Sequence, residues 1–102
     1  MSRLTTHVLD IMRGTGAGGM RVEVSAPDGQ VSACTLDDGG RATLLTGLVP
    51  GAYEIRFFAG DYAGTESFYD VIPVRCLIGT DLEHYHVPLI LSAYGYSTYR
   101  GG

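Results

Sequence analysis

The chain has 102 residues, 45% of them hydrophobic, and 11 acidic against 7 basic side chains give it a net charge of −4. A chain of this length is expected to form one domain, residues 1–102, with a modest buried core. The acidic balance argues against a nucleic-acid partner and against binding to an anionic membrane surface. No apolar run reaches the roughly 18 residues that a membrane-spanning helix needs.

Neither end of the chain resembles a targeting signal. The first residues lack the apolar stretch of a secretory signal peptide, and the last residues carry no peroxisomal address. We therefore expect a cytoplasmic protein. Cys34 and Cys76 have neither the spacing of a redox motif nor the density of a disulfide framework, which predicts two reduced, half-buried strand residues.

Short alternating apolar runs lie between turn signals rich in glycine, of which the chain has 15. This pattern predicts an all-β protein with about eight strands, arranged as a two-sheet sandwich. The predicted strands are 4–11, 20–25, 30–36, 41–45, 53–59, 69–78, 84–92 and 94–99. Loops or turns are expected at 14–19, 27–29, 37–40, 50–51 and 79–81.

A single helix is expected, over residues 61–68, where Tyr62 and Phe68 would dock on a sheet. In the predicted strand 84–92, one face carries Tyr85, Val87, Leu89 and Leu91, which is the natural core face. The other face carries His84, His86, Pro88, Ile90 and Ser92. Such a mixture is unusual for a surface that meets only solvent, so it indicates a subunit interface or a cleft.

The residues that could carry chemistry are His7, Arg41 and His86, with Arg100 and the terminal carboxylate as a further element. The pKa of histidine suits proton transfer near neutral pH, and arginine offers a planar fork of donors. By spacing alone, these residues could equally be ordinary surface or interface side chains.

The sequence disfavours three other kinds of site. A three-histidine zinc site is disfavoured because side chains on one face of a strand start about 7 Å apart and no carboxylate or thiol assists. We therefore expect neither a metal nor another cofactor. No Gly-x-Ser-x-Gly elbow marks a serine nucleophile, and the loop 14–19 lacks the lysine and the following helix of a phosphate-binding loop.

Three segments together resemble one known family. They are Leu4-Thr5-Thr6-His7-Val8-Leu9-Asp10, Asp38-Gly39-Gly40-Arg41, and a C-terminal pair, His84-Tyr85-His86-Val87-Pro88-Leu89 with Tyr94-Gly95-Tyr96-Ser97-Thr98-Tyr99-Arg100-Gly101. The chain is similar, over its whole length, to the 5-hydroxyisourate hydrolases, also called transthyretin-related or transthyretin-like proteins.

The resemblance implies a prealbumin-like sandwich of two four-stranded sheets, with a short helix after the fifth strand. It implies a homotetramer, a dimer of dimers, with active sites in the cleft between dimers. The implied reaction is the cofactor-free hydrolysis of 5-hydroxyisourate to 2-oxo-4-hydroxy-4-carboxy-5-ureidoimidazoline in purine catabolism.

Carried over position by position, the implied catalytic residues are His7, Arg41 and His86, and the implied substrate-binding segment is Tyr99-Arg100-Gly101-Gly102. We expect His86, alone or with His7, to take a proton from water, and Arg41 to hold the ring oxygens. The family usually ends in Ser where this chain has Gly102, and the extra glycine before Arg41 is expected to displace that side chain slightly. The alternatives are a non-catalytic, transthyretin-like small-molecule binding protein and, ranked last, a plain structural sandwich.

Overall fold

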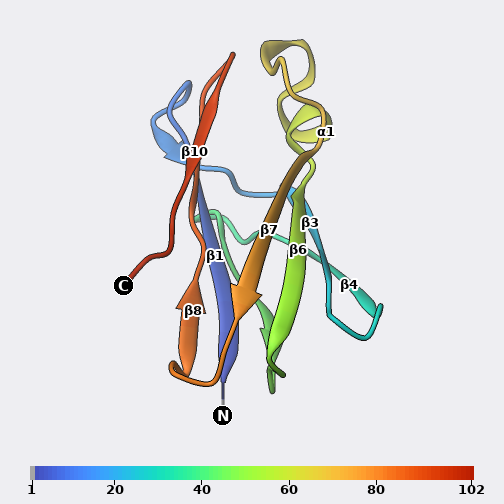
Figure 1. Ribbon diagram of the computed structural model, residues 1–102. Helices are drawn as coiled ribbons and strands as arrows, with labels where there is room; N and C mark the ends of the chain where they lie inside the picture. The colour runs from blue at the N-terminus through green and yellow to red at the C-terminus, as the bar shows by residue number, and fades with distance from the viewer. Residues whose placement is uncertain (1) are drawn as a thin grey trace.

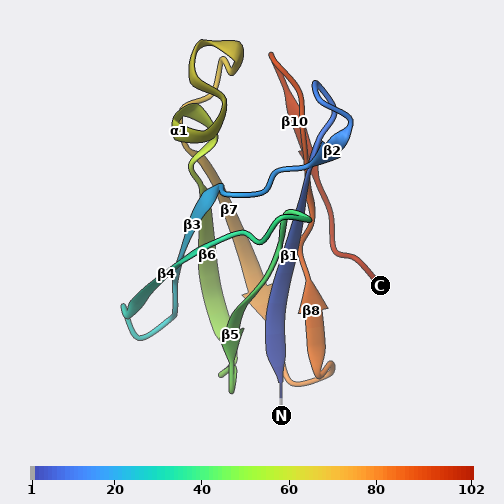
Figure 2. The same ribbon diagram turned by 180° about the vertical axis from the view of Figure 1, so that it is seen from behind.

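Two β-sheets pack face to face in the computed structural model, which describes residues 2–102, and a short helix closes one end (Figures 1 and 2). The strands are β1 (Arg3–Asp10), β2 (Thr15–Gly16), β3 (Arg21–Ser25), β4 (Val31–Thr35), β5 (Arg41–Thr46), β6 (Gly51–Phe57), β7 (Ile72–Ile78), β8 (His84–His86), β9 (Leu89–Leu91) and β10 (Tyr96–Thr98). The helix α1 (Ala59–Ala63) runs into a 3₁₀ turn, Gly64–Glu66. The two-sheet, mostly β architecture is the one that the sequence predicts.

β1 is the central strand of the larger sheet. That sheet has six strands in the order β10-β9-β1-β2, with β5 and β8 also paired to β1. The other sheet has four strands in the order β4-β3-β6-β7. The expectation of four strands in each sheet is wrong for the first sheet, because β2 adds a short pair and the predicted strand 84–92 is divided into β8 and β9.

The division of the strand 84–92 has a simple cause at Pro88. Proline has no N–H and cannot donate a hydrogen bond to a neighbouring strand, so regular pairing stops there. The hydroxyl of Thr6 fills the gap by donating to the carbonyl of Val87 (2.7 Å), and the N–H of Val87 donates to the carbonyl of Thr5 (3.0 Å). Pro88, expected on the outer face, is buried at this break.

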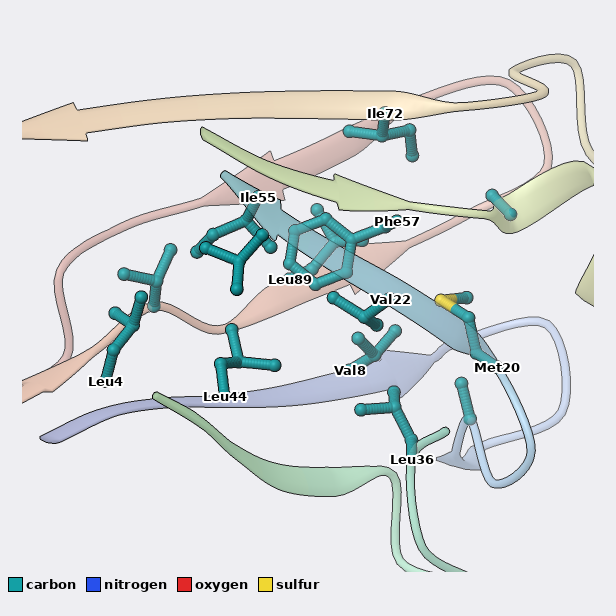
Figure 3. Close-up of a cluster of buried hydrophobic side chains, with 14 of the residues drawn as sticks. Leu4, Val8, Met20, Val22, Leu36, Leu44, Ile55, Phe57, Ile72 and Leu89 are labelled. Carbon is teal, nitrogen blue, oxygen red and sulfur yellow. The ribbon is translucent and has the colours of Figure 1, made fainter. Parts of the chain in front are cut away.

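Alternation along the strands builds the core. In β1 every second residue is buried, from Leu4 to Asp10, and β3 buries Val22 and Val24 in the same way. The apolar ones, Leu4, Val8 and Val22 among them, belong to one cluster with Phe57 and Leu89 between the sheets (Figure 3). Burying each large apolar side chain contributes about 1.5–3 kcal/mol, so the interior fixes which residues face outward. The predicted core face of the His84 run is confirmed, since Tyr85, Val87, Leu89 and Leu91 are all buried.

The helix begins earlier and ends earlier than the predicted 61–68. α1 starts at Ala59, directly after β6, and the following turn ends at Glu66. Tyr62 docks as expected, and its hydroxyl donates to Oδ2 of the buried Asp10 (2.7 Å). The docking predicted for Phe68 is wrong: this side chain is 72% exposed and its ring packs edge-on against Tyr69.

Several strand ends also differ from the prediction by a few residues. β6 ends at Phe57 because the chain turns into α1, and β7 begins only at Ile72.

Cys34 and Cys76 are free and half-buried, as predicted, and burial raises the pKa of both thiols. Within residues 2–102, no helix has the length and apolar character required to cross a bilayer.

Candidate functional site

The candidate residues come together on the outer face of the six-stranded sheet. In the antiparallel pair β1–β5, His7 lies opposite Arg41, and in the parallel pair β1–β8, Thr5 lies opposite His86. Neighbouring strands are about 4.8 Å apart, and residues two apart on one strand share a face. His7, Arg41 and His86, widely separated in sequence, therefore lie on one face of three adjacent strands.

Two hollows meet at the histidines of β8. The first, of about 410 Å³, is lined by Thr5, Asp37, Arg41, Thr43, His84 and His86, among others. His7 lies beside this hollow, in register with Arg41, and is not one of the residues that line it. The second hollow, of about 400 Å³, extends on the other side of His84 and His86 to the C-terminal segment.

The residues of the C-terminal segment, 99–102, border two different hollows. Arg100, Gly101 and Gly102 line the second hollow together with His86. Tyr99 does not line it; its side chain borders a separate, smaller and apolar hollow of about 170 Å³, which Arg100 also touches. Three of the four residues expected to bind substrate are thus gathered beside His86.

A tight turn presents Arg41 to the first hollow. Oδ1 of Asp37 accepts hydrogen bonds from the N–H groups of Gly39 and Arg41, both at 2.9 Å. Gly40 has φ +77°, and a Cβ there would lie 2.6 Å from the backbone nitrogen of Ala17, so only glycine fits. Glycine at position 40 is therefore a structural requirement of the turn, whereas a Cβ on Gly39 would meet only Oδ1 of Asp37 at 3.5 Å. Arg41 follows the turn in register with His7.

His86 is held on two sides. Its Nδ1 lies 2.8 Å from the hydroxyl oxygen of Thr5. On the other side, the N–H of Gly101 donates to the carbonyl of His86 (2.7 Å), and a Cβ on Gly101 would lie only 2.7 Å from Cδ2 of the ring. The chain end thus packs against the imidazole, and the absence of a side chain at residue 101 is what allows this contact.

The environment of His86 favours its neutral form. Burial lowers the pKa of His86 below its ordinary value of 6.5, and the nearby His84, His7 and Arg41 lower it further. A neutral imidazole at physiological pH has one nitrogen that accepts and one that donates a proton. The site therefore offers a titratable group suited to acid–base chemistry or to hydrogen-bond donation near pH 7.

Three residues to which the sequence assigned no catalytic role, Arg3, Thr5 and His84, belong to this site. The hydroxyl oxygen of Thr5 lies 2.6 Å from Nε2 of His84, and the guanidinium of Arg3 lies 3.3 Å from Nδ1 of the same ring. His84 could have been selected from its position two residues before His86, but a threonine in an alternating strand carries no such signal. In the described part of the chain, no three His, Cys, Asp or Glu side chains are arranged to hold a metal ion.

Comparison with known proteins gives consistent matches along the whole chain. The model of the HIUase/Transthyretin family matches residues 4–101. The 5-hydroxyisourate hydrolase of Caulobacter vibrioides is 40% identical over 114 residues, which cover 99% of this chain and 99% of that protein.

Solved structures agree with these matches. The 5-hydroxyisourate hydrolase of Klebsiella pneumoniae is similar with a TM-score of 0.87 and 36% identity, over 100% of both chains. Sea bream transthyretin in complex with thyroxine is similar with a TM-score of 0.84 and 27% identity, over 96% of this chain and 93% of that one.

Proposed function

Because the chain belongs to the HIUase/Transthyretin family, we propose that it is a hydrolase that opens the six-membered ring of 5-hydroxyisourate in urate degradation. Full-length relatives at about 40% identity carry the name 5-hydroxyisourate hydrolase, which supports the enzyme class and the substrate. The observation that carries the proposal is the outer face of β5, β1 and β8, where an arginine and two imidazoles share one surface.

The proposed reaction needs only water and the ring. The oxygen of water bonds to a ring carbonyl carbon, and the bond between that carbon and the adjacent ring nitrogen breaks. The carbon becomes a carboxylate, and the nitrogen takes up a proton and remains as part of a ureido group. The product is then 2-oxo-4-hydroxy-4-carboxy-5-ureidoimidazoline, and no redox step or cofactor takes part.

Three roles follow for the residues of the site. The imidazoles of His86 and His7 share the tasks of moving the proton of water and stabilising the charge that develops on the attacked carbonyl. The guanidinium of Arg41 binds the oxygens along one ring edge, for which its planar fork of N–H donors is suited. Arg100, Gly101 and Gly102 close the second hollow around the ring, with Tyr99 beside them.

We further propose that the chain works as a homotetramer, a dimer of dimers. β10 and β7 are the last strands of their sheets along the chain of pairings, so each leaves one edge free to pair. Leu77 on β7 is 82% exposed and Tyr96 on β10 is 42% exposed. Exposed apolar side chains on free sheet edges support an assembly that would bury them against a second copy. Light scattering of the purified chain measures the oligomeric state directly.

The expected location is the cytoplasm. Both cysteines are free, and the rise in their pKa through burial keeps them as unreactive thiols, which agrees with a reducing compartment. Fractionation of cells that express the chain would check this expectation.

A small-molecule carrier on the same sandwich is the alternative function. The similarity to sea bream transthyretin, whose structure holds thyroxine, is the observation in its favour. A carrier has no need for proton-transfer groups, however, and this chain concentrates His7, His84 and His86 on one face. A carrier function therefore does not explain why these histidines share one face.

Isotope labelling distinguishes the two functions. Urate is oxidised by uricase to generate 5-hydroxyisourate in water enriched in ¹⁸O, with and without the chain, and early products are analysed by mass spectrometry. The proposal predicts that the chain accelerates formation of the ureidoimidazoline, with one oxygen from water in its new carboxylate. Binding of the ring without any acceleration would favour the carrier.

A further inference from the structure

A hydroxyl shared between two imidazoles limits where their protons can be. Oγ1 of Thr5 lies 2.6 Å from Nε2 of His84 and 2.8 Å from Nδ1 of His86. A hydroxyl has a single hydrogen, so it can donate to one of these nitrogens and must accept from the other. The three groups therefore form a chain of hydrogen bonds with one of two directions.

Arg3 decides the direction. Its guanidinium lies 3.3 Å from Nδ1 of His84, and a guanidinium can only donate. Nδ1 of His84 must then accept, so neutral His84 carries its proton on Nε2 and donates it to Thr5. The hydroxyl of Thr5 in turn donates to Nδ1 of His86.

We propose that Arg3, His84 and Thr5 form a relay of fixed direction that holds the proton of neutral His86 on Nε2. Its consequence for catalysis rests on the proposed function: His86 presents an N–H to the ring of the substrate, and His84 and Thr5 are positioning residues. The imidazole of His86 contacts Thr5 at Nδ1 and is covered by Gly101 at Cδ2. Its remaining edge, formed by Cε1 and Nε2, is therefore the one that faces the hollows.

The tautomer of His86 with its proton on Nε2 gives His86 and His7 different roles in the proposed reaction. A nitrogen that already carries a proton cannot take one from water, so Nε2 of His86 acts as a hydrogen-bond donor to the carbonyl oxygen as it gains negative charge. His7 is left to take the proton of water as the new C–O bond forms, and to return it to the ring nitrogen as the C–N bond breaks. No net proton passes through His86, so the relay keeps its direction throughout.

The tautomers can be observed without any measurement of activity. We would label the full chain with ¹⁵N at histidine and record NMR spectra that connect each ring nitrogen with the carbon-bound hydrogens of the ring. The pH is raised until the signals of both rings no longer change with pH, so that both are neutral. The expected spectrum has a protonated Nε2 and an unprotonated Nδ1 for both His84 and His86. A proton on Nδ1 of either ring would overturn the proposal, whether or not the chain hydrolyses 5-hydroxyisourate.

Variants test each part of the relay. Arg3→Met removes the group that sets the direction, and a protonated Nδ1 should then appear in part of the His84 population; unchanged populations would refute the role of Arg3. Thr5→Val keeps the shape and the strand propensity but removes the hydroxyl, and should lower kcat by between about tenfold and 100-fold with little change in KM, since the imidazole loses its orientation.

Two controls separate this effect from a structural one. Thr5→Ser retains a hydroxyl and should restore both kcat and the NMR signature of His86. Thr46→Val makes the same change on β5, opposite Arg3, at a residue that lines neither hollow and is not hydrogen-bonded to either imidazole, and should leave both unchanged. A Thr5→Val variant with the kcat of the unchanged chain would show that the hydroxyl does not position His86.

Discussion

The outer faces of the two sheets both carry charged side chains, but they differ in whether these form ion pairs. On the four-stranded sheet, Glu23 pairs with Arg21 (2.6 Å) and with Arg56 (3.4 Å), and Arg56 also pairs with Glu54 (3.1 Å). Each of these four charges meets an opposite charge, while Arg75 on β7, opposite Glu54, enters no ion pair with any residue that the structure describes. Within this cluster little charge is left for a ligand to neutralise.

On the outer face of the six-stranded sheet, the arginines are not paired with carboxylates in this way. Arg3 and Arg41 lie on its outer face with three histidines, and between residues 2 and 102 no ion pair includes either arginine. The carboxylate that lines the first hollow, that of Asp37, is occupied with the backbone of its own turn. Arginines without a carboxylate partner, beside several imidazoles, favour an electron-rich ligand, which the paired charges of the other face do not.

The largest effect should come from removing the imidazole at the centre of the unmatched face. His86→Ala should lower kcat/KM on freshly generated 5-hydroxyisourate by about 100- to 1000-fold, the usual cost of losing a donor to a developing oxyanion. The rate is followed by ultraviolet absorbance. A variant that folds normally by circular dichroism and keeps near-full activity would exclude His86 from the site.

A smaller loss is expected from crowding that imidazole. In Gly101→Ala the new methyl group would lie 2.7 Å from Cδ2 of His86, so the ring or the chain end must move. Displacement of this size should reduce kcat by about tenfold or more. Gly95→Ala is the matched control, because its Cβ meets only the hydroxyl of Ser92 at an ordinary 3.6 Å. Equal rates for the two variants would contradict the role of the packed chain end.

Exchanging arginine for lysine on each face compares them directly. Arg41→Lys keeps the charge but loses the planar fork, and should raise KM or lower kcat/KM by about tenfold. Arg56→Lys makes the same change within the ion pairs of the other face and should leave kinetics unchanged. If both variants had the kinetics of the unchanged chain, Arg41 would not hold the ring.

The fourth prediction concerns the protonation of His86. Burial, then His84, His7 and Arg41 in order of size, lowers the pKa of His86, so its NMR titration should have a midpoint below 6.5. Since the unfolded chain then binds the proton more readily than the folded one, stability should fall as the pH drops below 6.5 through that midpoint. His84→Gln removes one of the causes and should move the midpoint upward; a midpoint above 6.5 in the unchanged chain would contradict the described environment.

The smallest effect should follow a change on the matched face. Glu23→Gln breaks two partly exposed ion pairs, which are each worth about 0.2–1 kcal/mol at most. Urea unfolding should detect a slight loss of stability, and the hydrolysis rate should not change. A large loss of activity in this variant would mean that the two faces do not act independently.

The amino-acid sequence predicts much of this arrangement because alternation along a strand is a local property. The faces of β1 and of the His84 run follow directly from it, and with them the outward position of His7 and His86. The break at Pro88 could also have been anticipated, since proline lacks the N–H that a continuous strand requires.

Other features depend on pairing between strands that are distant in the sequence, so the local sequence pattern does not predict them. The role of Thr5 arises only because β1 and β8 run parallel with Thr5 opposite His86. The start of α1 and the exposure of Phe68 depend on how the end of β6 meets the loop before β7, where weak helix propensity yields to packing. The resemblance to a known family selects the candidate residues that spacing alone does not separate from ordinary surface side chains.

The most direct measurement is the absorbance decay of uricase-generated 5-hydroxyisourate after the purified chain is added, compared with its spontaneous decay. If the donor-rich face is a hydrolytic site, the decay accelerates in proportion to the amount of chain added. A decay that stays at the spontaneous rate at every concentration of folded chain would contradict the proposed function.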